Sequence, residues 1–223
     1  MRHLMNIGLA LFISSSLYAT NYTFTTVDDR NSGANFTGIN DAGQIVGNNS
    51  LGGFIYSNGS FNYINAGGSF YAGGINNSGV VSGTLTVAAV DMGAIVDHGS
   101  VRTFSTPGWL RTLASQINDT GIVQGYYTTS GPVSHYLYTY DGSAVNTLVP
   151  PWATFPFPYG INNSGQMVGE YATAANTLVQ FFYDGTSFHE INNPNCYITE
   201  ITGMSNSGIV FSYYYGANGY SDF

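Results

Sequence analysis

A phrase of nine residues occurs five times in this chain and limits its fold more than any other feature. Each copy has an apolar residue, two polar turn residues, a small residue, a glycine and then mostly apolar residues. The copies are Ile39–Gly47, Ile75–Gly83, Ile117–Gly125, Ile161–Gly169 and Met204–Ser212, and their starts lie 36, 42, 44 and 43 residues apart. A period of this length is typical of solenoids, propellers and arrays, and β-propeller blades run to about 40 to 45 residues.

Each phrase predicts a β-hairpin. Asn or Asp opens a tight turn by bonding its own backbone, and glycine takes a positive φ without steric cost. The turn glycines are Gly43, Gly79, Gly121, Gly165 and Gly208. A second hairpin follows in four of the copies, starting at Phe54, Ala94, Tyr136 and Phe181, and three of these have Asn-Gly or Asp-Gly between alternating apolar runs. Two hairpins give one four-stranded antiparallel unit per repeat.

The two ends of the chain together can supply the strands that the fifth unit lacks. The chain stops at Phe223, where the third strand of the fifth unit is due, and Tyr22–Val27 has the alternating aromatic and β-branched character of a fourth strand. An open solenoid needs capping units, whereas a ring can borrow a strand across the join. The sequence therefore predicts an all-β, five-bladed β-propeller of four-stranded antiparallel blades, closed by pairing N-terminal and C-terminal strands in the last blade.

The N-terminus predicts export. Residues 1–19 have a charged start at Arg2, an apolar run from Leu4 to Leu17 and a small-residue cleavage site at Ala19, which together make a signal peptide. Residues 20–223 are then a single mature domain, which we expect to be secreted or periplasmic. We expect no membrane span in it, since no later stretch approaches 18 continuous apolar residues. Cys196 is the only cysteine, so no internal disulfide can form.

The amino-acid composition limits the kinds of partner that this protein can bind. Only 7% of residues are charged, against about 25% in an average protein, and the formal net charge is -8. A chain of this charge lacks the basic surface that nucleic acids require. Its polarity comes from Asn, Ser, Thr and Gly, which suit neutral polar ligands or other chains. The sequence does not indicate an oligomeric state.

Two copies of the phrase carry a family resemblance. Gly38–Gly47 and Gly160–Gly169 resemble the bacterial extracellular repeats called HAF. The His-Ala-Phe triplet of that family is degraded here and stands as Gly53-Phe54-Ile55, Gly93-Ala94-Ile95, His135-Tyr136-Leu137 and Gln180-Phe181-Phe182. The resemblance implies an exported protein, and it carries no established activity from which catalytic residues could be transferred.

The hairpins also predict where a site lies. Both tight turns of a unit fall on one face of the ring, and the other connections, which vary in length and are rich in rings, fall on the opposite face. Variable loops on a rigid scaffold are common places for binding residues. The predicted ligand-binding residues are Tyr71, Trp109, Arg111, Trp152, Phe155 and Tyr159. In the alternative interpretation, these rings fill space between neighbouring sheets and Pro150–Pro158 is a rigid loop.

These observations favour an exported noncatalytic recognition or adhesion module, lectin-like, that binds a glycan or surface polymer through the aromatic loops. Two alternatives stay open: a glycan-active hydrolase with Asp91 and Glu170 as its carboxylates, and a surface-assembly protein without a small ligand. No cofactor is predicted. Asn40-Asp41 and Asn118-Asp119 could offer oxygen ligands to calcium, but three copies have Asn where the Asp would be, so turn formation explains the pattern better than a metal site.

Overall fold

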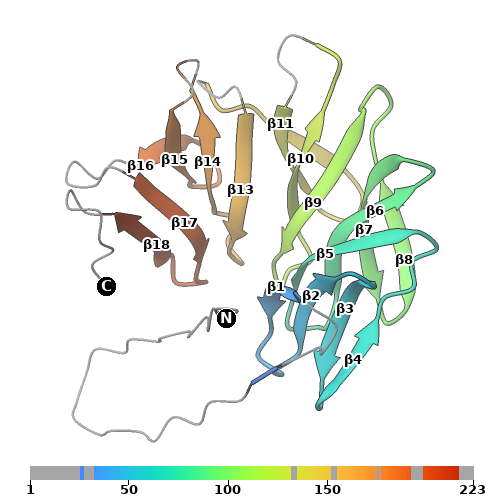
Figure 1. Cartoon of the computed structure of the whole chain (residues 1–223). Coiled ribbons are helices and arrows are strands. Elements are labelled where there is room, and N and C mark those ends of the chain that lie inside the picture. Colours follow the sequence, from blue (N-terminus) through green and yellow to red (C-terminus); the bar gives the residue numbers. More distant parts are fainter. Residues whose placement is uncertain are drawn as a thin grey trace, which may run out of the picture.

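The computed structural model describes residues 26–27, 33–131, 135–151, 155–173, 175, 177–191 and 198–215. These residues form β-strands and turns, and no helix occurs among them, which confirms the all-β class (Figure 1). The predicted signal peptide, Trp152 and Cys196 lie outside the described residues. So does most of the predicted strand Tyr22–Val27, of which only Thr26 and Val27 are described, and neither is in a strand.

Eighteen strands are described, and the first sixteen form four antiparallel meanders, which we call units 1 to 4. Unit 1 has β1 (Asn35–Ile39), β2 (Ile45–Asn49), β3 (Gly52–Ser57) and β4 (Ser60–Tyr63). Unit 2 has β5 (Ser69–Ile75), β6 (Val81–Val87), β7 (Val90–Asp97) and β8 (Ser100–Phe104). Unit 3 has β9 (Arg111–Ile117), β10 (Val123–Thr128), β11 (His135–Tyr140) and β12 (Val145–Leu148). Unit 4 has β13 (Phe155–Ile161), β14 (Met167–Ala172), β15 (Leu178–Tyr183) and β16 (Phe188–Ile191), and β17 (Ile198–Met204) pairs with β18 (Val210–Tyr215).

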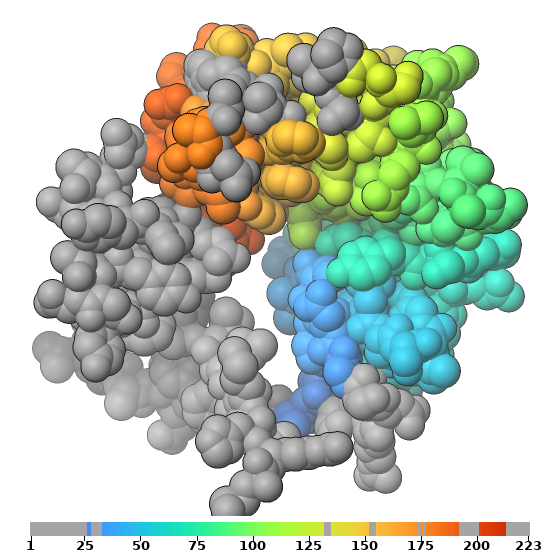
Figure 2. All heavy atoms as spheres, turned by 45° about the horizontal axis from the view of Figure 1, so that its top comes forward, coloured from blue at the N-terminus to red at the C-terminus, as the bar shows by residue number. Residues whose placement is uncertain are grey.

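The units follow one another around an arc in chain order (Figures 1 and 2). Their first strands, β1, β5, β9, β13 and β17, contact each other in succession. Units 2 and 3 are also joined by one parallel backbone pair, between Asp91 and Arg111. Four complete four-stranded units are thus present as predicted. Among the described residues, no strand pairing joins unit 1 to β17–β18.

The repeated phrase forms the predicted turn in all five copies. The turn glycines have φ between +73° and +86°. In the first copy, the N–H of Gly43 donates to the carbonyl of Asn40 at 2.9 Å, and the Oδ1 of Asn40 accepts from the N–H of Gln44 at 3.0 Å. The side chain thus closes its own turn, as expected for an Asx residue.

The same turns also bond to one another across unit boundaries, which the sequence did not predict. The N–H of Asp41 donates to Oδ1 of Asn77 at 2.9 Å. The same bond runs from Asn77 to Asp119, from Asp119 to Asn163 and from Asn163 to Asn206, at 2.8 to 2.9 Å. We call this series the Asx ladder. It holds the turns of all five copies in one row at one face of the molecule.

Amide side chains clamp unit 1 to unit 2 and unit 3 to unit 4. The Asn48 carboxamide donates to the carbonyl of Ala72 and accepts from its N–H, both at 2.8 Å. With its amide turned so that the nitrogen faces the C=O and the oxygen faces the N–H of Gly160, Gln124 pairs in the same way, both distances being 3.1 Å. Backbone groups at a strand edge need partners when they are buried. The two amides supply them, and apolar residues such as Val46 and Phe70 pack between units 1 and 2 behind the first clamp.

Candidate functional site

The antiparallel meanders put the two tight turns of each unit at one end and all other connections at the opposite end, as predicted. We call the end with the other connections the variable face. It carries the link between the second and third strands of each unit and the link from one unit to the next. Strands β5, β9 and β13 start on this face.

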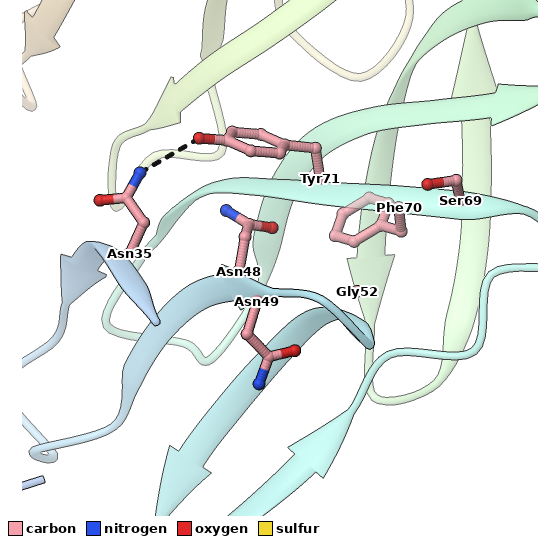
Figure 3. A pocket seen from close by; sticks show the side chains of 7 residues that line it. All are labelled: Asn35, Asn48, Asn49, Gly52, Ser69, Phe70 and Tyr71. Atoms are coloured by element: carbon pink, nitrogen blue, oxygen red, sulfur yellow. Dashed lines mark hydrogen bonds between the residues drawn. The ribbon is translucent and has the colours of Figure 1, made fainter. Parts of the chain in front are cut away.

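A pocket of about 290 Å³ opens on the variable face between units 1 and 2 (Figure 3). It is lined by Asn35, Asn48, Asn49 and Gly52 from unit 1, and by Ser69, Phe70 and Tyr71 from β5. None of the seven lining residues that the structure describes is charged, and three of them are carboxamides. The pocket can therefore offer donors and acceptors without an ionic contact.

Tyr71 and Asn35 form one wall of the pocket. The Nδ2 of Asn35 donates to the hydroxyl of Tyr71 at 3.3 Å, and the tyrosine remains 52% exposed (Figure 3). Phe70, which is buried, lies against Gly53 and Gly83, where an added Cβ would come within 3.0 Å of its ring. Glycine at these two positions lets the ring sit flat between the units, so that the start of β5 is fixed beside Asn48.

Of the five predicted ligand-binding residues that the structure describes, only Tyr71 lines this pocket. Asn35, Asn48 and Asn49 were missed, although the sequence carried a signal for two of them. The phrase of unit 1 is followed by Asn48-Asn49, whereas the equivalent pairs in the other complete units are Thr84-Leu85, Tyr126-Tyr127 and Glu170-Tyr171. An amide pair at that one position distinguishes the first boundary from the rest.

Arg111 and Phe155 occupy the place in units 3 and 4 that Ser69 has in unit 2, six residues before the isoleucine of the phrase. The Nε of Arg111 donates to Asp91 at 2.6 Å, and the hydroxyl of Thr86 donates to the other oxygen of that carboxylate at 2.6 Å. The Thr86 hydrogen bond lowers the pKa of Asp91, and Arg111 adds to this shift. Asp91 is therefore a stably ionised partner of Arg111.

Trp109 and Tyr159 both make packing or polar contacts within the fold. The Trp109 ring stacks on Tyr127 with centroids 3.5 Å apart and packs against the core of unit 3. The hydroxyl of Tyr159 donates to Glu170 at 2.5 Å. The structure thus gives Trp109 the space-filling contacts of the alternative interpretation, and Trp152 is outside the described residues.

The two carboxylates of the hydrolase alternative have separate surroundings. Asp91 is on β7 and bonds Thr86 and Arg111, whereas Glu170 is a buried residue of β14 that accepts from Tyr159. A glycosidase needs two carboxyl groups that flank one bond, about 5 to 9.5 Å apart. The contacts of Asp91 and Glu170 with other described residues do not bring the two carboxylates to one cavity.

The Asx residues that could offer oxygen to calcium have other partners. Asp119 accepts from the backbone N–H and the Nδ2 of Asn77 and from the Nδ2 of Asn163, at 2.8 to 3.2 Å. Within the part of the chain that the structure describes, no three His, Cys, Asp or Glu side chains form a group that could hold a metal ion.

Among the same residues, no helix is long and apolar enough to cross a bilayer.

No family model matches this chain, and no curated protein matches it. Among solved structures, it is similar to the N224Q mutant of the Aleuria aurantia lectin in complex with alpha-methyl-L-fucoside. The identity is 11%, the TM-score is 0.43, and the match covers 84% of this chain and 71% of the lectin chain. A likeness this distant assigns neither a fold family nor a ligand.

Proposed function

We propose that this protein is an exported, noncatalytic recognition module that binds a neutral glycan in the pocket between units 1 and 2. One observation carries the proposal: the described lining of the pocket has no charged side chain and combines three carboxamides with an exposed tyrosine ring. Sugars present hydroxyls around their edge and an apolar face. Amides match the hydroxyls, and an aromatic ring matches the face.

The size of the pocket sets the scale of the ligand. Binding pockets for small molecules have volumes of about 300–1,000 Å³. The pocket of about 290 Å³ lies at the lower end of that range, which fits one sugar unit of a longer chain. Asn35 and Tyr71 come from different units, so the ligand touches both sides of the boundary.

The test is a glycan array followed by titration of the neutral glycan that binds best. Tyr71→Ala removes the stacking surface and should weaken binding at least about tenfold. Tyr71→Phe keeps the ring and should retain most of the affinity. Leu178→Ala, an equally exposed apolar residue in unit 4, is the matched control and should bind as the wild type does. Absence of any neutral glycan ligand, or equal binding by Tyr71→Ala, would reject the pocket.

We also propose that the fold is a closed five-bladed β-propeller. The exposure of Ile39, the first residue of the phrase in unit 1, supports this. This residue is 64% exposed, whereas the equivalent Ile75, Ile117 and Ile161 are 6 to 9% exposed. Those three are buried because the preceding unit covers them. In a closed ring, the fifth blade would cover Ile39 in the same way. Ile39→Ala should then cost about 2–4 kcal/mol, as Ile117→Ala should, whereas an exposed Ile39 would cost less than about 0.5 kcal/mol. Urea unfolding of both variants decides between the two.

Export and membership of the HAF-like repeats remain part of the same proposal. The support is the N-terminal signal pattern and the two copies of the phrase that resemble that family. N-terminal sequencing of the protein recovered from the periplasm or the medium should start at Thr20. Recovery from the cytoplasm with Met1 retained would contradict export.

A further inference from the structure

Four rings gather on the variable face at the boundary between units 3 and 4, away from the pocket, and Arg111 lies on the neighbouring strand β9, near enough to act on His135 electrostatically. Arg111, Tyr126, His135, Phe155 and Phe157 come from β9, β10, β11 and β13, and we call them the Arg111 cluster. The His135 and Phe155 ring centroids are 4.6 Å apart, and Tyr126 lies 5.8 Å from His135 and 5.4 Å from Phe157. The rings therefore form one continuous surface across three strands.

The strand register fixes Arg111 beside these rings. Arg111 pairs directly with Thr128, and Thr128 pairs directly with His135. Directly paired residues point to the same side of a sheet, so Arg111 and His135 share one side with two strand spacings, about 10 Å, between their backbones. Burial and the charge of Arg111 lower the pKa of His135, which therefore presents a neutral ring near pH 7.

The guanidinium of Arg111 faces solvent with its carboxylate partner behind it. Its side chain is 57% exposed, whereas that of Asp91 is 14% exposed. Nε is bonded to Asp91, and the terminal amino groups have no hydrogen bond to another residue that the structure describes. β9, β10, β11 and β13 contain no Asp or Glu. The free end of a guanidinium binds a carboxylate through two parallel hydrogen bonds.

We propose that the Arg111 cluster is a second glycan site, specific for an acidic sugar, in which Arg111 binds the carboxylate of a hexuronate unit and Phe155 and His135 contact its ring. Phe155 is 42% exposed and so has a face available for stacking. The overall charge of -8 opposes anions at long range, but at physiological salt charges more than about 8 Å away are largely screened. The short-range contact with Arg111 then determines whether the carboxylate binds. The site rests on residues that the neutral pocket does not use, so either site can fail alone.

The test is affinity electrophoresis at pH 7 through gels that contain polygalacturonate, alginate or hyaluronan, each beside its carboxyl-reduced form. At least one uronate polymer should retard the wild type, with at least about tenfold weaker binding to the reduced polymer. Arg111→Gln should abolish this difference, and Arg111→Lys, which keeps the charge without the fork, should retain part of it. Arg102→Gln makes the same charge change on β8 and is the matched control. Circular dichroism checks that each variant folds.

Several outcomes would overturn the site. Retardation by none of the three uronates would do so, as would equal losses in Arg111→Gln and Arg102→Gln. Equal retardation by poly-L-glutamate would show that a carboxylate is bound without a sugar. If Tyr71→Ala loses uronate binding while Arg111→Gln keeps it, the uronate occupies the pocket, and glycan binding stands without the second site. Uronate binding that depends on Arg111, with no neutral glycan bound, would instead refute the pocket and support the second site.

Discussion

Asn48 offers the sharpest test of how one unit is held to the next. Its carboxamide satisfies both backbone groups of Ala72 at 2.8 Å, and the side chain is buried. Asn48→Leu keeps the approximate volume and removes both hydrogen bonds. The N–H of Ala72 at the buried edge of β5 then has no side-chain partner, and its carbonyl keeps only the hydrogen bond from the hydroxyl of Thr37 at 3.0 Å.

The magnitude follows from those two bonds. A buried polar group left unpaired costs about 1–3 kcal/mol, and the added apolar surface of leucine offsets part of the sum. With the N–H of Ala72 left unpaired, we expect a net loss of about 1–3 kcal/mol in the free energy of unfolding. For a domain of this size, this lowers Tm by about 2–12 °C.

Urea unfolding and thermal melts measure this loss. Asn62→Leu makes the same chemical change at an exposed position of β4, and it should cost less than about 0.5 kcal/mol. Asn48→Asp adds a pH signature. Its carboxylate can accept from the N–H of Ala72 but faces the carbonyl, so its folded pKa is raised and its deficit should grow as the pH rises above the ordinary carboxyl range. A loss below about 0.5 kcal/mol in Asn48→Leu would refute the clamp.

Two further predictions test the repeat and its ladder. Gly125→Ala would put a Cβ 2.1 Å from the carbonyl oxygen of Leu113 and should lower the free energy of unfolding by about 3 kcal/mol or more. Gly121 has φ +86° and open space around it, so Gly121→Ala should cost only about 1–2 kcal/mol. Equal losses in urea unfolding would contradict the packing argument. Hydrogen bonds, that of Asn163 first, lower the pKa of Asp119 from its ordinary value of 3.8, so the stability that Asp119 contributes is present above that value and is lost as the pH falls through its folded pKa. Asn163→Ala should make thermal stability less dependent on pH in this acid range, and an unchanged dependence would count against the ladder.

The sequence predicted those parts of the fold that depend on local chemistry. An Asx side chain such as that of Asn40 closes its own turn, and Gly43 takes a positive φ whatever surrounds it. The meander order of the strands follows from such hairpins, and so does the assignment of Tyr71 and Arg111 to the variable face. These features need only neighbours that are close in the chain.

The candidate site was predicted less completely because it depends on contacts across unit boundaries. The sequence predicts Trp109 as a ligand-binding residue because it is an aromatic residue in a variable loop, but the structure stacks it on Tyr127. Nothing in the sequence analysis predicts Asn48, which both lines the pocket and clamps β5. Composition cannot distinguish an exposed ring from a stacked one, since that depends on which partner the packing brings near.

The amino-acid sequence alone therefore determined the repeat, the hairpins and the face on which a site would lie, because residues a few positions apart make those structures. Only the tertiary structure decided that Asn35 meets Tyr71, 36 residues away, and that Asp91 stands behind Arg111. These contacts between side chains depend on how closely one unit packs on the next. Glycines such as Gly53, whose missing Cβ leaves room for Phe70, set that distance through space rather than along the chain.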